Sequence, residues 1–432
     1  MIKVSSWGRL SALPHTVHAL TEAGDVQSVL ARSLPGVAFG HGRSYGDVCL
    51  NPGGTIWATT KLDRFVSFDP ETGILVCEAG LMLRDIQRHL MPQGWSLPVT
   101  PGTQFVTIGG AIANDVHGKN HHSQGSFGDH IRRIRLVRTD GQVIECGPDH
   151  HGEWFAATVG GLGLTGLITE VELQLLRCQG EWVETETLPF ATLEEFSQIT
   201  EASIATWDYT VSWVDCTTDG GGRGLFSRGN STDRVGLKNP KKRRLSVPIT
   251  PPLSLINRFS TRAFNQAYFT VKKDRVGRTL SHYEPFFYPL DNLRQWNRLY
   301  GPKGFFQYQC VVPHRDGLEA IQAILKEISL KGDGSFLAVL KTFGDRKPRG
   351  LMSFPQPGIT LALDFPNEGK RTLGLLDRLD AIVRQIGGRV YLAKDARLSR
   401  EMFEASYPNL NEFLKYRDPG MSSSMSRRLM GS

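Results

Sequence analysis

The chain has 432 residues, 40% of them hydrophobic and 22% charged, a composition that is typical of a globular protein and excludes an intrinsically disordered one. Its length favours two or three domains over a single core. The net charge is +7, but no nucleic-acid motif and no aromatic interleaving accompanies the basic residues, so we expect no nucleic-acid partner.

In chain order, the first half of the sequence alternates between short strands and helices. Apolar spacing and turn residues predict helices over 16–33, 81–94 and 153–161, short strands over 36–42 and 167–178, and hairpins over 65–80 and 130–147.

The second half begins with a stretch rich in Gly, Ser, Asn, Pro and charge over 215–252, which predicts a long loop that is a mobile lid or disordered. Beyond it we expect strands over 305–313, 336–344, 358–366 and 389–397, helices over 317–332 and 373–388, and a helical, polar tail over 398–432. This β-α-β-β-α-β order fits one antiparallel sheet covered by helices.

The six cysteines are scattered without a CxxC motif, and they indicate buried residues in a reducing compartment. The first twenty residues lack the apolar core of a signal peptide, and no run of 18 apolar residues follows, so we expect a cytoplasmic protein. The basic run from Lys238 to Ser246 is either a solvated loop or a contact with anionic lipid, which would place the protein peripherally at the inner membrane face.

Three glycine-rich loops share the first part of the chain: GHGRSYGD (Gly40 to Asp47), PGTQFVTIGGAIAND (Pro101 to Asp115) and GGLGLTG (Gly160 to Gly166). Closely spaced glycines make tight turns, and they also let the backbone approach a bulky ligand and point N–H groups at it. The second loop opens a helix, whose first-turn N–H groups suit an anion. Three such loops in one region favour a cofactor cradle over three ordinary turns.

The third loop contains a GxGxxG pattern at Gly161, Gly163 and Gly166. A nicotinamide fingerprint needs a strand before this pattern and a helix after it. The sequence predicts the reverse order, and the acidic residues about twenty positions on, Glu184 and Glu186, do not end a strand of a βαβ unit. We therefore reject the Rossmann interpretation.

Four histidines lie within Thr107 to His130, and His117, His121 and His122 have a spacing that raises the question of a zinc site. Gly118 weakens a helical register between the first two, no cysteine is near, and Asp115 and Asp129 are the only close carboxylates. We expect no metal. His117 suits a neutral histidine beside a cofactor, and the other two suit packing positions.

The three loops in this order, with HGKNHHSQGSFG after the second, resemble FAD-dependent enzymes of the vanillyl-alcohol oxidase / p-cresol methylhydroxylase superfamily. Within it, the sequence is similar to the oxidase subunits of decaprenylphosphoryl-β-D-ribose 2′-epimerases. The likeness runs nearly end to end and continues at FFQYQCVVP, VLKTFG, LDFP, VYLAKDAR and SRRL. The segment HGKNHHSQGSFG is a specific signal, whereas single glycine loops indicate only the superfamily.

The resemblance implies an α+β, two-domain fold of the vanillyl-alcohol-oxidase type (PCMH-type). Its FAD-binding domain would cover 1–178, and an antiparallel-sheet substrate or cap domain would cover 179–388 with a mobile loop at about 216–252. A C-terminal segment, 389–432, would return to the FAD-binding domain.

The resemblance also implies which residues hold FAD. They are Gly40, His41, Gly42, Arg43, Ser44, Tyr45, Gly46, Pro101, Gly102, Thr103, Val106, Gly109, Gly110, Ala111, Asn114, Gly118, Gly163, Gly166, Ile168 and Tyr391. Many superfamily members attach the flavin through a histidine in the first loop, and Arg43 takes that place here, so we expect noncovalent FAD. His41, two residues earlier, keeps covalent attachment open.

For the reaction, Lys394 matches a lysine at the pyrimidine end of the isoalloxazine, where an ammonium stabilises the charge that follows hydride transfer to N5. His117 is the candidate base or orienting residue at the reacting hydroxyl. Lys119, Trp213, Gln307, Gln309 and Lys341 are candidate substrate contacts, and strand alternation places Gln307 and Gln309 on one face. A position that often carries a cysteine in this family is Ala362 here.

The implied activity is oxidation of a secondary alcohol of a polyprenyl-phosphoryl pentose to a ketone. This is the first half of a 2′-epimerisation in cell-envelope arabinan biosynthesis, and a separate NAD(P)H-dependent keto-reductase would complete it. An alditol or aldonolactone oxidase acting on soluble polyols is the alternative, and a non-catalytic binding protein that retains the fold is a third possibility.

Overall fold

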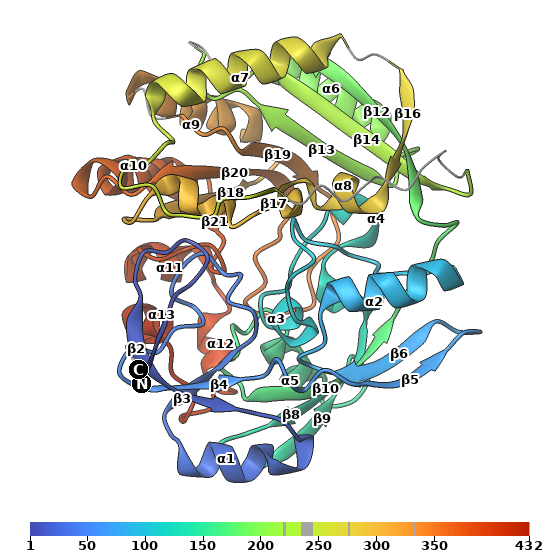
Figure 1. Ribbon diagram of the computed structural model, residues 1–432, viewed down its shortest axis with the longest axis vertical. Coiled ribbons are helices and arrows are strands. Elements are labelled where there is room, and N and C mark those ends of the chain that lie inside the picture. Colours follow the sequence, from blue (N-terminus) through green and yellow to red (C-terminus); the bar gives the residue numbers. More distant parts are fainter. Residues whose placement is uncertain (219–221, 235–244, 275–276, 332–333, 432) are drawn as a thin grey trace.

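The computed structural model describes residues 1–218, 222–234, 245–274, 277–331 and 334–431. Two smaller sheets and the glycine loops occupy one end of the molecule, and an eight-stranded sheet with its helices occupies the other (Figure 1). Helices and antiparallel sheets are mixed in both parts, as expected for an α+β fold.

The N-terminal sheet has four strands in the order β1-β2-β4-β3, and its strands are β1 (Ile2–Val4), β2 (Leu13–Ala19), β4 (Thr55–Ala58) and β3 (Gly36–Phe39). The turn η1 (Ala23–Asp25) and helix α1 (Val26–Arg32) follow β2. The helix predicted over 16–33 is therefore wrong in its first half. Thr16 to Ala19 pair in parallel with Thr55 to Ala58 of β4, a strand that the sequence did not predict, so tertiary pairing outweighs helical spacing there.

The second sheet has five strands in the order β5-β6-β10-β8-β9. Its strands are β5 (Phe65–Asp69), β6 (Ile74–Glu78), β10 (Leu167–Gln174), β8 (Ile131–Val137) and β9 (Val143–Cys146). Both predicted hairpins are confirmed as β5-β6 and β8-β9. Around this sheet lie α2 (Leu83–Leu90), η2 (Met91–Gln93), α3 (Ile108–Ala113), α4 (His121–Gln124), η3 (Phe127–His130) and α5 (Gly152–Thr158), and β7 (Trp95–Ser96) pairs with β11 (Leu176–Arg177).

The third sheet has eight strands in the order β16-β12-β14-β13-β19-β20-β18-β21, all antiparallel. They are β16 (Arg278–His282), β12 (Trp182–Phe190), β14 (Gly224–Thr232), β13 (Tyr209–Val214), β19 (Ala338–Phe343), β20 (Gly358–Pro366), β18 (Phe305–Val312) and β21 (Arg389–Val390). The predicted β-α-β-β-α-β unit is confirmed, with α9 (Gly317–Lys331) and α10 (Lys370–Gln385) as its helices.

The two faces of this sheet have different neighbours. On one face, side chains such as Phe226 and Leu361 pack in one core with residues of α6 (Leu193–Ser203), α9 and α10. On the opposite face, α7 (Arg258–Lys273) lies near Trp213, whose ring centroid is 5.0 Å from that of Tyr268. The linking segments near this face are β15 (Leu245–Ser246), which pairs in parallel with β17 (Leu293–Arg294), together with α8 (Tyr283–Phe287), η4 (Pro289–Asn292) and η5 (Trp296–Tyr300).

Two predicted segments need correction. The loop predicted over 215–252 contains β14, a nine-residue strand that pairs with β12 on one side and β13 on the other, so pairing on both sides outweighs its loop-like composition. Residues 235–244, with most of the basic run, lie outside the described residues. The strand predicted over 389–397 is confirmed only for β21, and the chain turns over residues 392–394.

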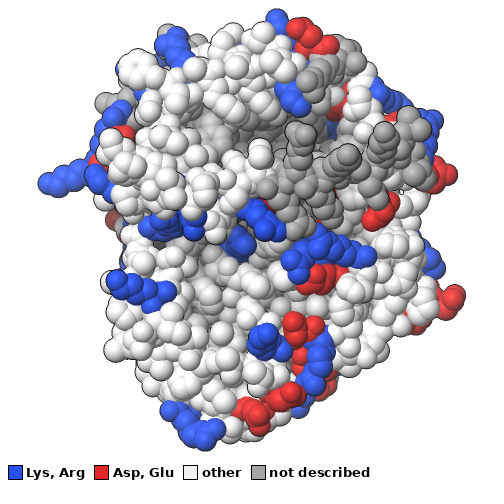
Figure 2. All heavy atoms as spheres, in the orientation of Figure 1, with Lys and Arg blue, Asp and Glu red and all other residues white. Residues whose placement is uncertain are grey.

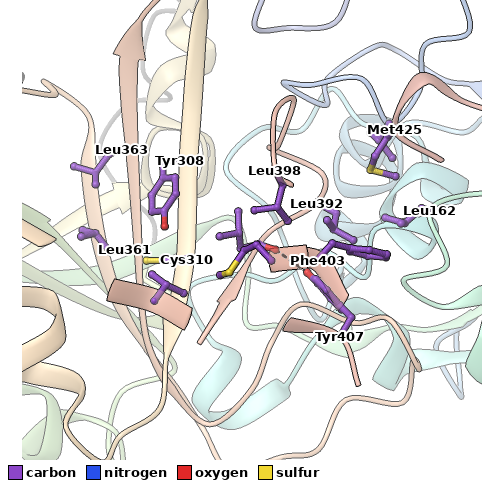
Figure 3. Packing of buried hydrophobic residues seen from close by; sticks show 14 of the residues in the cluster. Leu162, Tyr308, Cys310, Leu361, Leu363, Leu392, Leu398, Phe403, Tyr407 and Met425 are labelled. Carbon is purple, nitrogen blue, oxygen red and sulfur yellow. Dashed lines mark hydrogen bonds between the residues drawn. The ribbon is translucent and has the colours of Figure 1, made fainter. Parts of the chain in front are cut away.

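The C-terminal tail is helical as predicted, with α11 (Arg400–Ser406), α12 (Leu410–Leu414) and α13 (Ser424–Met430), but it is not a polar surface segment. Phe403, Tyr407 and Met425 are buried and belong to a core that also includes Leu162 and Leu361 (Figure 3). The tail therefore packs against both the glycine-loop end and the eight-stranded sheet.

Polar contacts also join the tail to the five-stranded sheet. The carboxylate of Asp418 accepts hydrogen bonds from the backbone N–H of Thr139 at 2.7 Å and from its hydroxyl, and Arg138 donates to the carbonyl of Tyr416 at 3.1 Å. All six cysteines are free.

Across the described residues, no helix has both the length and the apolar character that crossing a membrane requires.

Candidate active site

A cavity of about 920 Å³ lies where the glycine loops meet the eight-stranded sheet. Lys and Arg side chains cross the middle of the molecular surface at this level (Figure 2). Every residue predicted to bind cofactor or substrate lines this cavity except Gly46 and Ala111. A Cβ at Gly46 would lie 1.5 Å from the carbonyl oxygen of Asp395, so this glycine permits close backbone packing, and Ala111 is fully buried in a core.

The glycine loops leave open space along one wall of the cavity. A Cβ at Gly102 or at Gly163 would meet no atom within 4 Å, and Gly163 has a φ of 73° that favours glycine. The first and second loops touch, because a Cβ at Gly40 would lie 2.6 Å from Oγ1 of Thr107. The hydroxyl of Thr107 in turn accepts a hydrogen bond from the N–H of Gly110 at 3.2 Å, at the start of α3. As expected, the GxGxxG pattern follows a helix, α5, and precedes a strand, β10.

The first loop brings a buried cation into the cavity wall. The guanidinium carbon of Arg43 lies 4.4 Å from the ring centroid of Trp7 and 5.2 Å from that of Phe105. Burial lowers the pKa of Arg43, and burial and the charge of Arg43 lower the pKa of His41. Nε of Arg43 is buried and has no hydrogen-bond partner among the described residues. It can donate to a ligand oxygen.

Strand register assembles the opposite wall. Gln307 pairs with Asp364, Gln309 with Ala362, and Lys341 with Thr360 across β18, β20 and β19. Gln307 and Gln309 lie on the same face, as alternation predicts, and both line the cavity.

His117 lies at the centre of the polar residues. Its Nε2 is 2.9 Å from Nε2 of Gln309, and its Nδ1 is 3.2 Å from Nζ of Lys341, which also donates to the carbonyl of Gly118 at 3.2 Å. Burial, followed by the charges of Lys341, His121 and Lys394, holds the pKa of His117 well below its usual range. The imidazole is therefore neutral, with one nitrogen able to accept a proton.

Lys394 projects from the turn after β21. Its Nζ lies 4.0 Å from the ring centroid of Tyr45, which belongs to the first glycine loop. Burial lowers the pKa of Lys394 to about 8, although the nearby carboxylate of Asp364 opposes the shift. Burial raises the pKa of Asp364 to about 7, and the amide of Gln307 donates to its Oδ1 at 2.6 Å.

Three half-buried lysines, Lys119, Lys341 and Lys394, share this cavity. Burial lowers the pKa of Lys341 to about 7 and that of Lys119 to about 8, close to the value of Lys394. Nζ of Lys119 donates to the carbonyl of Phe286 at 2.6 Å. Such concentrated, desolvated positive charge favours an anionic ligand.

The ring of Trp213 lines the cavity. Its indole N–H donates to the carbonyl of Phe336 at 3.1 Å, which fixes the orientation of the ring. Beside it, Phe264 and Tyr268 of α7 line the cavity, and neither was predicted. No signal in the sequence connects α7 with the glycine loops.

Asp364 was also missed as a site residue. It lies on the strand face that Thr360 and Ala362 share, and it approaches Lys394 and Gln307. Polar residues that alternate along an otherwise apolar strand, as in ITLALDFP, are a signal that could have identified it.

The histidines that suggested a metal have separate partners. The ring of His121 packs 4.2 Å from that of Phe343, and a ring nitrogen of His122 lies 2.9 Å from the carbonyl oxygen of Trp207. Across the parts of the chain that the structure describes, no three His, Cys, Asp or Glu side chains are placed to hold a metal ion.

These residues fit a large anionic cofactor. The glycine loops leave room for the cofactor, and the positive lysines of the cavity attract its negative charge. Nε of Arg43 and Oδ1 of Asn114 are buried without hydrogen-bond partners among the described residues. The family model described as an FAD binding domain matches residues 13–147. The chain is an FAD-dependent oxidoreductase acting on CH–OH groups.

Relatives extend the match beyond the cofactor domain. The chain is 34% identical to the decaprenylphosphoryl-beta-D-ribose oxidase of Mycolicibacterium smegmatis, over 99% of this chain and 97% of that protein. It is 30% identical to a protein of Streptomyces coelicolor described as "Uncharacterized protein in mprA 5'region", over 81% of this chain and all of that protein. It is 28% identical to the L-gulonolactone oxidase of Mus musculus over 45% and 44% of the two chains. The chain belongs to the decaprenylphosphoryl-β-D-ribose oxidase family within the vanillyl-alcohol oxidase / p-cresol methylhydroxylase superfamily.

Proposed function

We propose that the enzyme oxidises a secondary hydroxyl of a polyprenyl-phosphoryl pentose to a ketone, as the first half of a 2′-epimerisation. The observation that carries the proposal is the convergence of His117, Lys341, Gln309 and Lys394 on the cavity that the glycine loops border. The substrate class follows from the name of the relative in Mycolicibacterium smegmatis, which matches nearly the whole chain.

Bound FAD supplies the hydride acceptor, at N5 of its isoalloxazine. The residues that would hold it are the cavity-lining members of the three glycine loops, with Asn114, Gly118, Ile168 and Tyr391. We propose that the attachment is noncovalent. Arg43, which takes the place of the linking histidine of other superfamily members, cannot form the histidyl linkage, and His41 lies two residues before that position.

His117 is proposed to accept the hydroxyl proton at Nε2 and to orient the reacting carbon. Lys394 offers a cation, beside the ring of Tyr45, that stabilises negative charge developing in the cavity. The amides of Gln307 and Gln309 can hydrogen-bond sugar hydroxyls, and Lys119 can pair with the substrate phosphate, while the ring of Trp213 packs against the sugar.

The phosphate and the lipid distinguish this substrate from a soluble polyol. The cavity continues past Trp213 to Phe264, Tyr268 and Lys272 of α7, which provides room and a cation beyond a single sugar ring. The limited similarity to L-gulonolactone oxidase keeps an alditol or aldonolactone oxidase as the second candidate.

The test is anaerobic mixing of the FAD-loaded enzyme with polyprenyl-phosphoryl ribose, with ribitol and with L-gulonolactone. We expect rapid loss of the yellow flavin absorbance only with the lipid-linked sugar. Equal or faster loss with a soluble polyol would contradict the proposed substrate. Adding a separate NAD(P)H-dependent keto-reductase to the first reaction should yield the 2′-epimer.

Two simpler measurements bear on the cofactor. Flavin that leaves the protein on acid precipitation supports noncovalent binding, and flavin retained in the pellet contradicts it. A purified protein that is colourless and takes up no FAD would contradict the assignment of the cavity.

A further inference from the structure

Helix α7 has an unusual distribution of side chains. Its buried residues are the polar Thr261 and Asn265, whereas Phe259 is 84% exposed and Val271 is 58% exposed. A surface helix on a sheet ordinarily buries its apolar face. The outward apolar face of α7 therefore needs a partner outside the described part of the chain.

Four exposed apolar residues of α7 form one stripe. Phe259, Ala263, Ala267 and Val271 recur every four residues, which places them along one side of the helix, and all four are exposed. Leu253 and Leu255, in the segment that leads into α7, are 77% and 53% exposed. We call these six residues the α7 stripe.

Basic residues flank the α7 stripe. Arg258, Arg262 and Lys273 are exposed residues of α7, and Arg258–Lys273 contains no acidic residue. An apolar side with a basic border is typical of a helix that lies in the interface of an anionic membrane.

The position of α7 connects this surface with the cavity. The helix lies along the outer edge of the eight-stranded sheet's end of the molecule (Figure 1). Phe264, Tyr268 and Lys272 line the cavity from the same helix whose α7 stripe faces outward. Polar anchors hold it in place, since the amide of Asn265 donates to Asp215 at 3.0 Å and Arg223 donates to Gln266 at 2.8 Å.

We propose that the α7 stripe docks on a bilayer that contains anionic phospholipid, with the apolar side chains at the acyl boundary and the flanking cations at the headgroups. A second copy of the chain fits less well, because an isologous contact between two α7 helices would bring two sets of three exposed cations together. The inference deepens the proposed function, because a polyprenyl-linked substrate resides in a bilayer and could enter the cavity beneath α7.

The test is cosedimentation of the FAD-loaded full chain with vesicles, without substrate. The vesicles contain phosphatidylcholine either alone or mixed with phosphatidylglycerol. We expect binding to the mixed vesicles. The double variant Phe259→Ser/Val271→Ser should bind about tenfold more weakly, and Arg262→Gln/Lys273→Gln should lose the preference for phosphatidylglycerol. None of these four residues lines the cavity.

Matched controls change exposed residues outside the α7 stripe and its flanking cations. Val66→Ser/Val143→Ser changes two exposed apolar residues of the five-stranded sheet, and Arg315→Gln/Lys326→Gln removes two exposed cations near and on α9, so both should bind like the unmodified enzyme. Unchanged flavin absorbance and melting temperature establish that each variant is folded.

Three results would overturn the proposal. The first is that the unmodified enzyme does not bind the vesicles, and the second is that Phe259→Ser/Val271→Ser binds them as strongly as the unmodified enzyme. The third is that sedimentation velocity shows a dimer that this double variant converts to a monomer, which would identify a second copy as the occupant. Because no substrate is present, the outcome is separate from the fate of the proposed substrate. Vesicle binding with turnover of soluble polyols alone would reject the substrate and retain the docking surface.

Discussion

Nζ of Lys341 lies 3.2 Å from Nδ1 of His117, so the protonation state of the lysine determines which nitrogen of the imidazole carries the proton. A charged Lys341 donates to Nδ1 and leaves the single ring proton on Nε2. A neutral Lys341 can accept from Nδ1–H, which makes Nε2 the acceptor that the amide of Gln309 contacts at 2.9 Å and that a substrate hydroxyl would have to reach in place of this amide. We therefore expect these two residues, which are far apart in sequence, to act as one acid–base unit.

The first prediction concerns pH. Burial lowers the pKa of Lys341 to about 7, so the amine is charged below that pH and neutral above it. If Nε2 is the base, kcat/KM should rise with pH through about 7. The variant Lys341→Met should lose this inflection and about tenfold in kcat/KM. Lys347→Met, at an exposed lysine of the same segment, is the control, and an inflection that persists in Lys341→Met would contradict the coupling.

The second prediction concerns Lys394. Replacement by Ala should slow flavin reduction about 100-fold in stopped-flow absorbance, because the buried cation no longer stabilises the developing charge. In the unmodified enzyme, reduction should also slow as pH rises through about 8, where burial places the pKa of this lysine. Lys370→Ala, at an exposed position, should leave the rate unchanged. Unaltered reduction kinetics in Lys394→Ala would remove the assigned role.

The third prediction concerns the cofactor cradle. A side chain at Gly102 would extend into cavity space, where a Cβ meets no protein atom within 4 Å. Gly102→Val should therefore lower FAD occupancy at least about tenfold while leaving the apoprotein as stable as before. The ratio of flavin to protein absorbance measures the occupancy. Gly24→Val, at a glycine with equal space outside the cavity, serves as the control, and full occupancy in Gly102→Val would contradict the cradle.

The fourth prediction concerns Asp115, which the second glycine loop buries completely. Its carboxylate accepts hydrogen bonds from the N–H of Gly128 at 2.8 Å and from the hydroxyls of Ser126 and Ser353 at 2.8 Å and 2.5 Å. Asp115→Ala leaves three buried donors without an acceptor and should lower the free energy of unfolding by about 3 kcal/mol. Asp115→Asn should lose less of the free energy of unfolding than Asp115→Ala, because the amide oxygen can still accept hydrogen bonds.

The same carboxyl predicts a pH dependence of stability. Burial raises the pKa of Asp115 from 3.8 to about 6 in the folded chain, so the native state binds its proton more tightly than the unfolded state. The resulting stabilisation is present below pH 3.8 and is lost as pH rises through about 6, by up to about 3 kcal/mol. Urea unfolding at a series of pH values should show this decrease in the free energy of unfolding in the unmodified enzyme and not in Asp115→Asn. Parallel pH profiles for the two proteins would refute it.

The family resemblance predicted most of the residues in the cavity wall, and local patterns agree with it. Strand alternation places Gln307 and Gln309 on one face, and the spacing of the glycines indicates a cofactor cradle, because both patterns depend on residues close in sequence. His117 and Lys341 are 224 positions apart, and their contact depends on how β19 packs against the second loop. The local spacing of residues does not predict that packing. Lys394 was placed on a strand, whereas the chain turns there to bring its ammonium to Tyr45.

The missed elements share a different cause. Strand β14 has the glycine and polar residues of a loop, and only pairing with β12 and β13 on both sides makes it a strand. Helix α7 buries polar residues and exposes phenylalanine, which reverses the pattern by which surface helices are recognised. In both cases the neighbours of the segment, and not its own composition, determine its place.

The burial of Met425 and Leu429 beside Leu162 has a consequence for synthesis on the ribosome. The core at the glycine-loop end includes side chains from α13, and Asp418 anchors to Thr139 of the chain's first half. That half therefore lacks part of its interior until α13 has left the exit tunnel. We expect nascent chains to take up FAD only after α13 has emerged, and chaperones to hold the early segments until then.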